Sequence, residues 1–162
     1  MSTSIAVLLT LHTAISLVAI VAGLVVTAAL LRGRITRLPT DAFLVTAIAT
    51  SVTGYFFPFS GVTPAMIVGA IALAILALVL LARHQFRFRG AWRWIYAIGT
   101  VASLYLLLFV LVVQMFRHIE VLQPYDGQAL FQASQLAVLI AAMAIGVLAV
   151  RRFQPLLVKL ST

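Results

Sequence analysis

Five long apolar runs constrain this chain more than any other feature of its sequence. They cover residues 5–31, 42–57, 64–82, 94–116 and 129–150. A helix needs roughly 17–25 mostly apolar residues to cross a bilayer, whose hydrocarbon core is about 30 Å thick. Backbone groups in lipid must hydrogen-bond within their own segment, so we expect helices and not open strands. The sequence therefore predicts an all-α, polytopic transmembrane bundle of five helices, forming a single integral membrane domain over residues 1–162.

Composition and charge fit this class. Hydrophobic residues make up 64% of the chain and charged residues 9%, whereas soluble domains are about 45–50% apolar and about 25% charged. A net charge of +8 suggests nucleic acid binding in a soluble domain, but here the basic residues stand at the ends of apolar runs. We therefore expect the lipid bilayer as the main partner and no nucleic acid. The chain has no cysteine, which excludes disulfides and thiolate metal sites.

The positions of the basic residues predict the orientation. Loops rich in Lys and Arg stay on the cytoplasmic side of a membrane. Of the 11 Lys and Arg residues, all but Arg117 fall where the predicted helices would end on one side: Arg32, Arg34, Arg37, Arg83, Arg87, Arg89, Arg93, Arg151, Arg152 and Lys159. We therefore expect the N-terminus outside and the C-terminus in the cytoplasm.

Polar residues mark helix starts and packing faces. Thr63 before Pro64 is typical of a capped helix start, and Asp41 after Thr40 suggests a similar cap for the second helix. That second run is the shortest and carries several threonines. The threonines of the second run share a face, as do His12 and Ser16 of the first, and such stripes in membrane helices are typical of packing seams.

Three fragments carry a resemblance to a known group. They are TSVTGYFFPF at 50–59, GAWRWIY at 90–96 and the segment from Leu104 to Gln114. The chain resembles small bacterial inner-membrane proteins that have no assigned activity. The resemblance implies a multi-pass protein of the bacterial inner (cytoplasmic) membrane and implies no chemistry. It departs from the group's pattern in the loop at 118–127, where a proline-rich stretch is expected and only Pro124 is present.

The polar stretch 114–135 separates the last two apolar runs and predicts where a site would lie. Amides and imidazoles in apolar surroundings are costly unless they are paired. We expect Gln132 and Gln135 to meet Gln114 or His12 across the outer part of the bundle. This arrangement would be either helix packing alone or a pocket for a lipid, a quinone head group or a partner protein. The candidate ligand-binding residues are His12, Tyr105, Gln114, Arg117, His118, Gln132 and Gln135.

Two other functions stay open at this point. Histidine is the usual axial ligand of haem b, so His12 and His118 are the candidate ligands of a redox protein. A small transporter or channel is the further alternative, if the chain forms oligomers. Neither HExxH, GxSxG nor paired carboxylates occur, so no catalytic residue is predicted. The sequence thus favours a non-enzymatic subunit or binding module, with no cofactor in the main interpretation and haem or quinone as alternatives.

Overall fold

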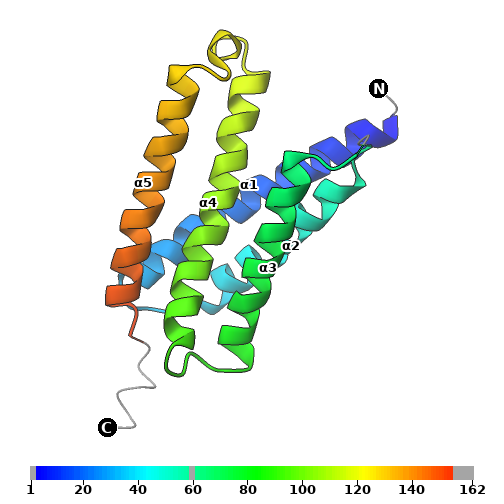
Figure 1. Ribbon diagram of the computed structural model, residues 1–162. Coiled ribbons are helices and arrows are strands. Elements are labelled where there is room, and N and C mark those ends of the chain that lie inside the picture. Colours follow the sequence, from blue (N-terminus) through cyan, green and yellow to red (C-terminus); the bar gives the residue numbers. More distant parts are fainter. Residues whose placement is uncertain (1–2, 59–60, 155–162) are drawn as a thin grey trace.

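The structure, a computed structural model, describes residues 3–58 and 61–154 and contains only helices within them. The long helices are α1 (Thr3–Leu31), α2 (Arg37–Thr53), α3 (Pro64–His84), α4 (Trp92–His118) and α5 (Ala129–Arg152), with two short 3-10 helices, η1 (Gly54–Phe56) and η2 (Gln123–Tyr125). Figure 1 shows their arrangement. The all-α prediction is confirmed, and α1, α3, α4 and α5 are long and apolar enough to cross a membrane. Their ends lie within two residues of the predicted ones.

Helix α2 differs from its prediction. It begins at Arg37 and has 17 residues, and the N-cap residue Thr36 makes no side-chain cap bond. The predicted cap at Thr40 and Asp41 is therefore wrong, because both residues lie inside the helix. Pro39 does not prevent this, since proline is tolerated in the first helical turn. A helix of 17 residues spans about 26 Å at about 1.5 Å per residue, less than the hydrocarbon core.

The start of α3 agrees with its prediction. Thr63 has extended backbone angles, and its side chain accepts a hydrogen bond from the Met66 backbone N–H at 3.3 Å. Pro64 occupies the first helical position, where the missing N–H costs nothing. Thr63 is therefore a true N-cap, whose side chain satisfies one of the unpaired backbone donors of the helix start.

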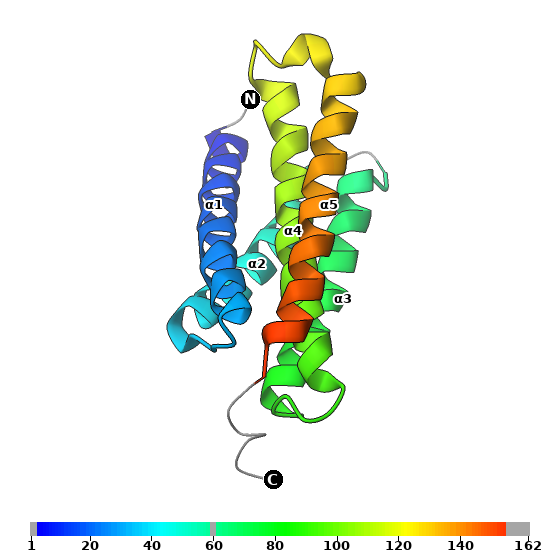
Figure 2. The same ribbon diagram turned by 90° about the vertical axis from the view of Figure 1, so that its left-hand side faces the viewer.

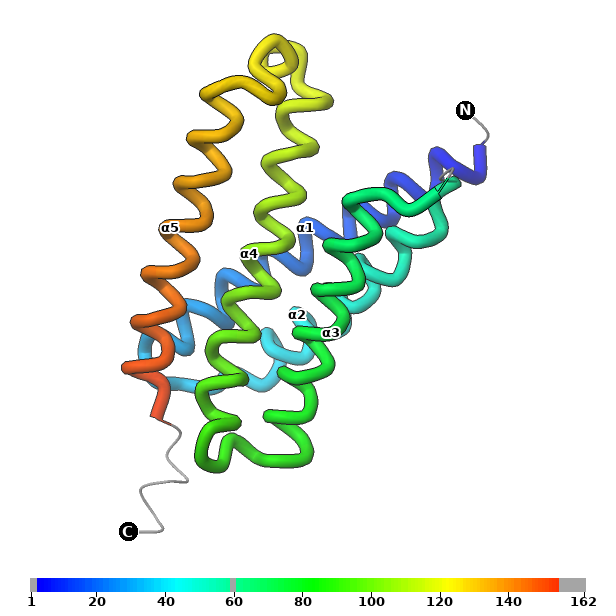
Figure 3. Tube along the Cα trace, in the orientation of Figure 1, coloured from blue at the N-terminus to red at the C-terminus, as the bar shows by residue number. Residues whose placement is uncertain are grey.

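The helices form two groups that meet at one end. Helix α1 packs along α2, and α4 packs against both α3 and α5. In Figures 1 and 3, α1 passes behind α4, so that its C-terminal end lies near the end of α5 and its N-terminal end lies beyond α3. Figure 2 shows α1 standing beside the α4–α5 hairpin. The result is a bundle in which the α4–α5 hairpin separates, toward its turn, from α1, α2 and the start of α3, which stay together through η1.

The crossing of α1, α2 and α4 depends on Gly23. A Cβ atom at this position would lie 2.8 Å from a ring carbon of Phe43 on α2 and 2.9 Å from a methyl carbon of Leu104 on α4. Both neighbours are buried, at 0% and 5% exposure. Small residues in membrane helices permit such close approach. Glycine is therefore the residue that lets three helices meet in the core.

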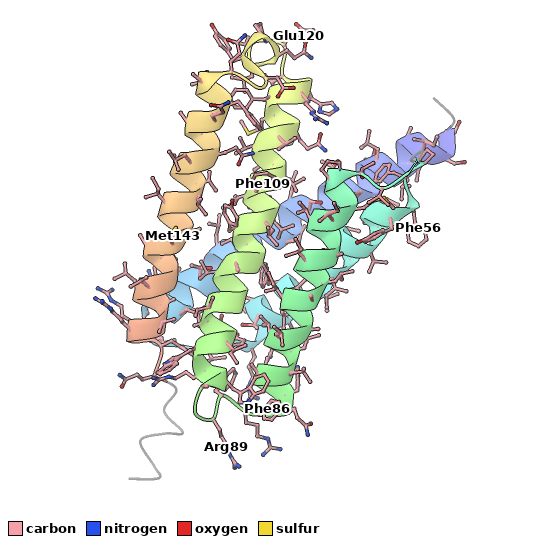
Figure 4. All side chains as sticks on the ribbon, viewed as in Figure 1. Phe56, Phe86, Arg89, Phe109, Glu120 and Met143 are labelled. Carbon is pink, nitrogen blue, oxygen red and sulfur yellow. The ribbon has the colours of Figure 1, made fainter. Side chains whose placement is uncertain are left out.

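Charge separates the two ends of the bundle. The loop after α1, the start of α2, the α3–α4 loop and the end of α5 lie at one end, which we call the basic end. Arg89 and Phe86 mark the basic end in Figure 4, and Glu120 marks the opposite end, which we call the hairpin end. The described basic residues except Arg117 therefore gather at the basic end, as predicted, and Lys159 lies outside the described residues.

Candidate functional site

The turn between α4 and α5 is held by bonds within itself. Nδ1 of His118 lies 3.1 Å from the backbone oxygen of Gln114, and Nε2 of Gln123 donates to the backbone oxygen of Arg117 at 3.1 Å. The side chain of Gln128 donates to the backbone oxygen of Pro124 at 2.8 Å. These contacts satisfy carbonyls at the C-terminal end of α4 and in the turn. The turn thus caps the hairpin without contributions from α1, α2 or α3.

Arg117, the exception to the charge rule, is largely available to other groups. Its Nε lies 3.9 Å from a carboxylate oxygen of Asp126, and the two side chains are 65% and 40% exposed. An exposed ion pair of this kind contributes about 0–1 kcal/mol. The guanidinium therefore keeps most of its donors free for a phosphate or carboxylate from outside the protein.

Helix α5 meets α4 through Gln135. Its Nε2 donates to the backbone oxygen of Phe109 at 3.2 Å, while its Oε1 is buried without a hydrogen-bond partner. Tyr105, half-buried, lies one turn from Phe109, with ring centroids 6.2 Å apart. Gln132 is exposed. The expected bonds from Gln132 or Gln135 to Gln114 or His12 do not form among the described residues, because Gln135 is used to join the two hairpin helices.

His12 belongs to the seam between α1 and α2. Its Nδ1 lies 2.8 Å from the hydroxyl oxygen of Thr53, and its ring packs edge-on against Phe57 at 5.3 Å. The Thr53 hydroxyl also donates to the backbone oxygen of Ala49 at 2.7 Å. Since a hydroxyl has one proton, we infer that His12 Nδ1–H is the donor to Thr53. The predicted packing seam is confirmed here, where Ser16 also lies 3.4 Å from the Thr50 hydroxyl.

The two candidate haem ligands are held on separate groups of helices. His12 faces α2, whereas His118 is exposed at the end of α4 and contacts its own helix. The ends of α1 and α4 that carry them spread apart in Figure 1. This arrangement does not pair the two imidazoles, and no cluster of three or more metal-ligating side chains occurs in the described residues.

One face of α4 changes from buried to open along its length. Leu104, Leu107, Leu111, Gln114 and His118 follow one another at spacings of three and four, so they share a face. Leu104 is 5% exposed against the core, Leu107 and Leu111 are partly buried, and Gln114 and His118 are exposed. We call the last four residues the α4 strip. It is apolar at membrane depth and polar at the hairpin end.

A second polar region lies toward the basic end, and sequence reasoning missed it. Arg83 on α3 and Asp41 on α2 form an ion pair at 2.6 Å, with side chains 12% and 55% exposed. Deeper in the bundle lie buried hydroxyls on α1, α2 and α4, among them Thr27, Thr40 and Thr100. The signal available in the sequence was an acid and a base on adjacent helices, at the end where bases gather.

The comparisons with known proteins add no relative. No protein-family model, curated protein or solved structure matches this chain. The resemblance based on short fragments therefore stays a prediction, and the geometry described above is the basis for interpreting the site.

Proposed function

We propose that this chain is a multi-pass protein of the bacterial inner membrane that binds an amphiphile of the outer leaflet along the α4 strip. In this proposal the protein is a binding module and not an enzyme. All five helices cross the membrane, with η1 extending α2, and the basic end faces the cytoplasm because loops rich in arginine stay on that side.

The observation that carries the proposal is the loss of cover along a single face of α4. At the inner end of this face Leu104 lies against Gly23 of α1 in the buried core, whereas Gln114 and His118, at the outer end of the α4 strip, are exposed. An acyl chain would lie against Leu107 and Leu111, and its head group would reach Gln114 and His118. An amide and an imidazole beside an apolar surface give a ligand both orientation and hydrogen bonds, which is the usual composition of a binding site for an amphiphile.

In this proposal Arg117 selects an anionic phospholipid, against the two acids of the same turn, Glu120 and Asp126. Arg117 is 65% exposed and its nearest acid, Asp126, lies 3.9 Å away. An arginine near a membrane surface attracts anionic lipid by about 1 kcal/mol, or about fivefold in affinity.

The test uses a photoreactive phosphatidylglycerol in phosphatidylcholine vesicles that contain the full chain. We expect crosslinks in the α4 peptide that ends at His118, with about a fivefold loss in Arg117→Ala and a larger loss in the Arg117→Ala, His118→Ala double variant. Arg89→Ala, an exposed arginine at the basic end, is the matched control and should leave this labelling unchanged.

Two outcomes separate the proposal from its competitors. Labelling spread evenly over the outward face of α5, including Leu139, Ile140 and Met143, would indicate ordinary boundary lipid and refute a site on α4. Competition by a quinone, with labelling unaffected by Arg117→Ala, would assign the α4 strip to a carbonyl head group and would contradict the role given to the arginine.

A further inference from the structure

Three buried threonines lie at one level of the bundle, toward the basic end. Gly23, Phe43 and Leu104 meet at the crossing of α1, α2 and α4. Thr27, Thr40 and Thr100 each lie about one helical turn from one of these residues, in the direction of the basic end. Their exposures are 5%, 1% and 1%. Because α1 runs opposite to α2 and α4, the register places the three hydroxyls around the same point between the helices.

Tyr96 and Ser103 extend this group on α4. The Tyr96 hydroxyl lies close to Thr40 and Thr100 and near the charges of Asp41 and Arg83. Tyr96 and Ser103 are 1% and 2% exposed. We call Thr27, Thr40, Tyr96, Thr100 and Ser103 the hydroxyl cluster. It contains residues from three helices, α1, α2 and α4.

Two members of the hydroxyl cluster, Thr27 and Ser103, have buried oxygens that make no hydrogen bond within the described residues, although hydroxyls in membrane helices can bond to their own backbone. The Thr100 oxygen is also buried, and it lies beside the Tyr96 hydroxyl. A buried polar group left unpaired costs about 1–3 kcal/mol. Unpaired hydroxyls in one buried part of the bundle are typical of a site for a bound species that both donates and accepts hydrogen bonds. Water has that chemistry, and buried water commonly makes about 2–4 bonds to polar groups of this kind.

The Asp41–Arg83 pair lies between the hydroxyl cluster and the basic end. Asp41 follows Thr40 directly, its carboxylate is half exposed, and it lies 2.6 Å from a guanidinium nitrogen of Arg83 that is itself nearly buried. The pair is therefore open to solvent at Asp41, and its charges lie near Tyr96 of the hydroxyl cluster. On the opposite side, Phe43 and Leu104 close against Gly23.

We propose that the hydroxyl cluster is a hydrated chamber, which exchanges water with the basic end and whose mouth is the Asp41–Arg83 ion pair. The chamber holds water or a small uncharged polar molecule of similar hydrogen-bonding capacity, and it ends at the apolar contact of Gly23, Phe43 and Leu104. It is separate from the α4 strip, which lies beyond that contact toward the hairpin end.

The absence of native cysteine makes the chamber directly testable by thiol labelling. Thr100→Cys and Ser103→Cys place one thiol each in the hydroxyl cluster, and a small water-soluble methanethiosulfonate is applied to the purified full-length protein. The matched control is Ala97→Cys, on the same helix and 0% exposed, but within the apolar core and nearer the basic end. Thiols react as hydrated thiolates, so we expect labelling at least about tenfold faster in the cluster than at Ala97→Cys.

The ion pair is tested in the same background. Adding Arg83→Ala should raise the labelling rate of Ser103→Cys severalfold and leave that of Ala97→Cys unchanged. Equal rates at the cluster and at Ala97→Cys would refute the chamber, whether both are slow or both are fast. An unchanged Ser103→Cys rate after Arg83→Ala would refute the role of the ion pair as the mouth. Ser103→Cys replaces only one oxygen atom by sulfur, so this variant should fold. If Thr100→Cys does not fold, the labelling rate of Ser103→Cys still decides the test.

Discussion

The substitution Gly23→Ala tests the crossing of α1, α2 and α4 most sharply. The added methyl group would lie 2.8 Å and 3.0 Å from ring carbons of Phe43 and 2.9 Å from a methyl of Leu104. Both side chains are buried in the core, so neither moves aside into lipid or solvent. Inserting a methyl group into a packed core costs about 1–3 kcal/mol.

Alanine also gains stability as a helix former, and this gain offsets part of the clash. Replacing glycine by alanine inside a helix favours folding by about 0.8–1 kcal/mol. The net effect of Gly23→Ala is thus a destabilisation of about 1 kcal/mol, which corresponds to a lower Tm by about 2–4 °C. The assay is thermal unfolding of the purified protein in one detergent.

Gly146→Ala is the matched control for this prediction. Gly146 also lies inside a long helix, but a Cβ atom there would meet its nearest neighbour, a methyl of Val101, at 3.9 Å. That is an ordinary contact, so the helix-forming gain remains and the protein should be equally or more stable than the wild type. If Gly23→Ala were as stable as Gly146→Ala, the three-helix contact at Gly23 would be wrong.

Three further substitutions address the polar contacts. Asp41→Asn leaves the nearly buried Arg83 without its charge partner and should lower the free energy of unfolding by about 1–3 kcal/mol, less than for a fully buried pair because Asp41 is 55% exposed. Arg117→Ala breaks only the exposed pair with Asp126 and should change stability by less than about 0.5 kcal/mol; denaturant titration of both variants checks the contrast, and equal losses would contradict it. Thr53→Val removes the bond to His12 and should cost about 0.6–1.7 kcal/mol in the same titration, with no loss counting against a role for the seam.

The sequence predicts the long helices well because their signal is local. Apolar length, the Thr63 cap and the position of basic residues each depend on a few neighbouring residues, and α1, α3, α4 and α5 follow them closely. Helix α2 was misplaced because Pro39, Thr40 and Asp41 read as a loop with a cap, although proline is also compatible with a first turn. The difference moved Asp41 from a cap to an ion pair with Arg83.

The candidate site was harder to predict because it depends on how helices cross. The distance of each residue from the outer end of its helix predicted that His12 lies level with Gln114 and Gln135. That distance does not determine which helices are neighbours. His12 instead contacts Thr53 on α2, and Gln135 contacts the backbone of α4. The hydroxyl cluster was missed for the same reason, since Thr27 and Thr100 are far apart in sequence and are brought to one level only because Gly23 lets α1 approach Leu104 of α4.

The separation of the α4–α5 hairpin from α1 toward the hairpin end is the central claim, because the proposed ligand needs the exposed end of the α4 strip, Gln114 and His118. Pulsed electron resonance between spin labels on introduced cysteines measures it directly. One pair, Thr13→Cys with Gln132→Cys, joins exposed sites on α1 and α5 near the hairpin end, and the other, Arg34→Cys with Arg152→Cys, joins exposed sites near the basic end. A clearly longer distance for the first pair in lipid is the predicted result. Equal distances, or a shorter one for the first pair, would mean a closed bundle and would contradict a binding face on α4.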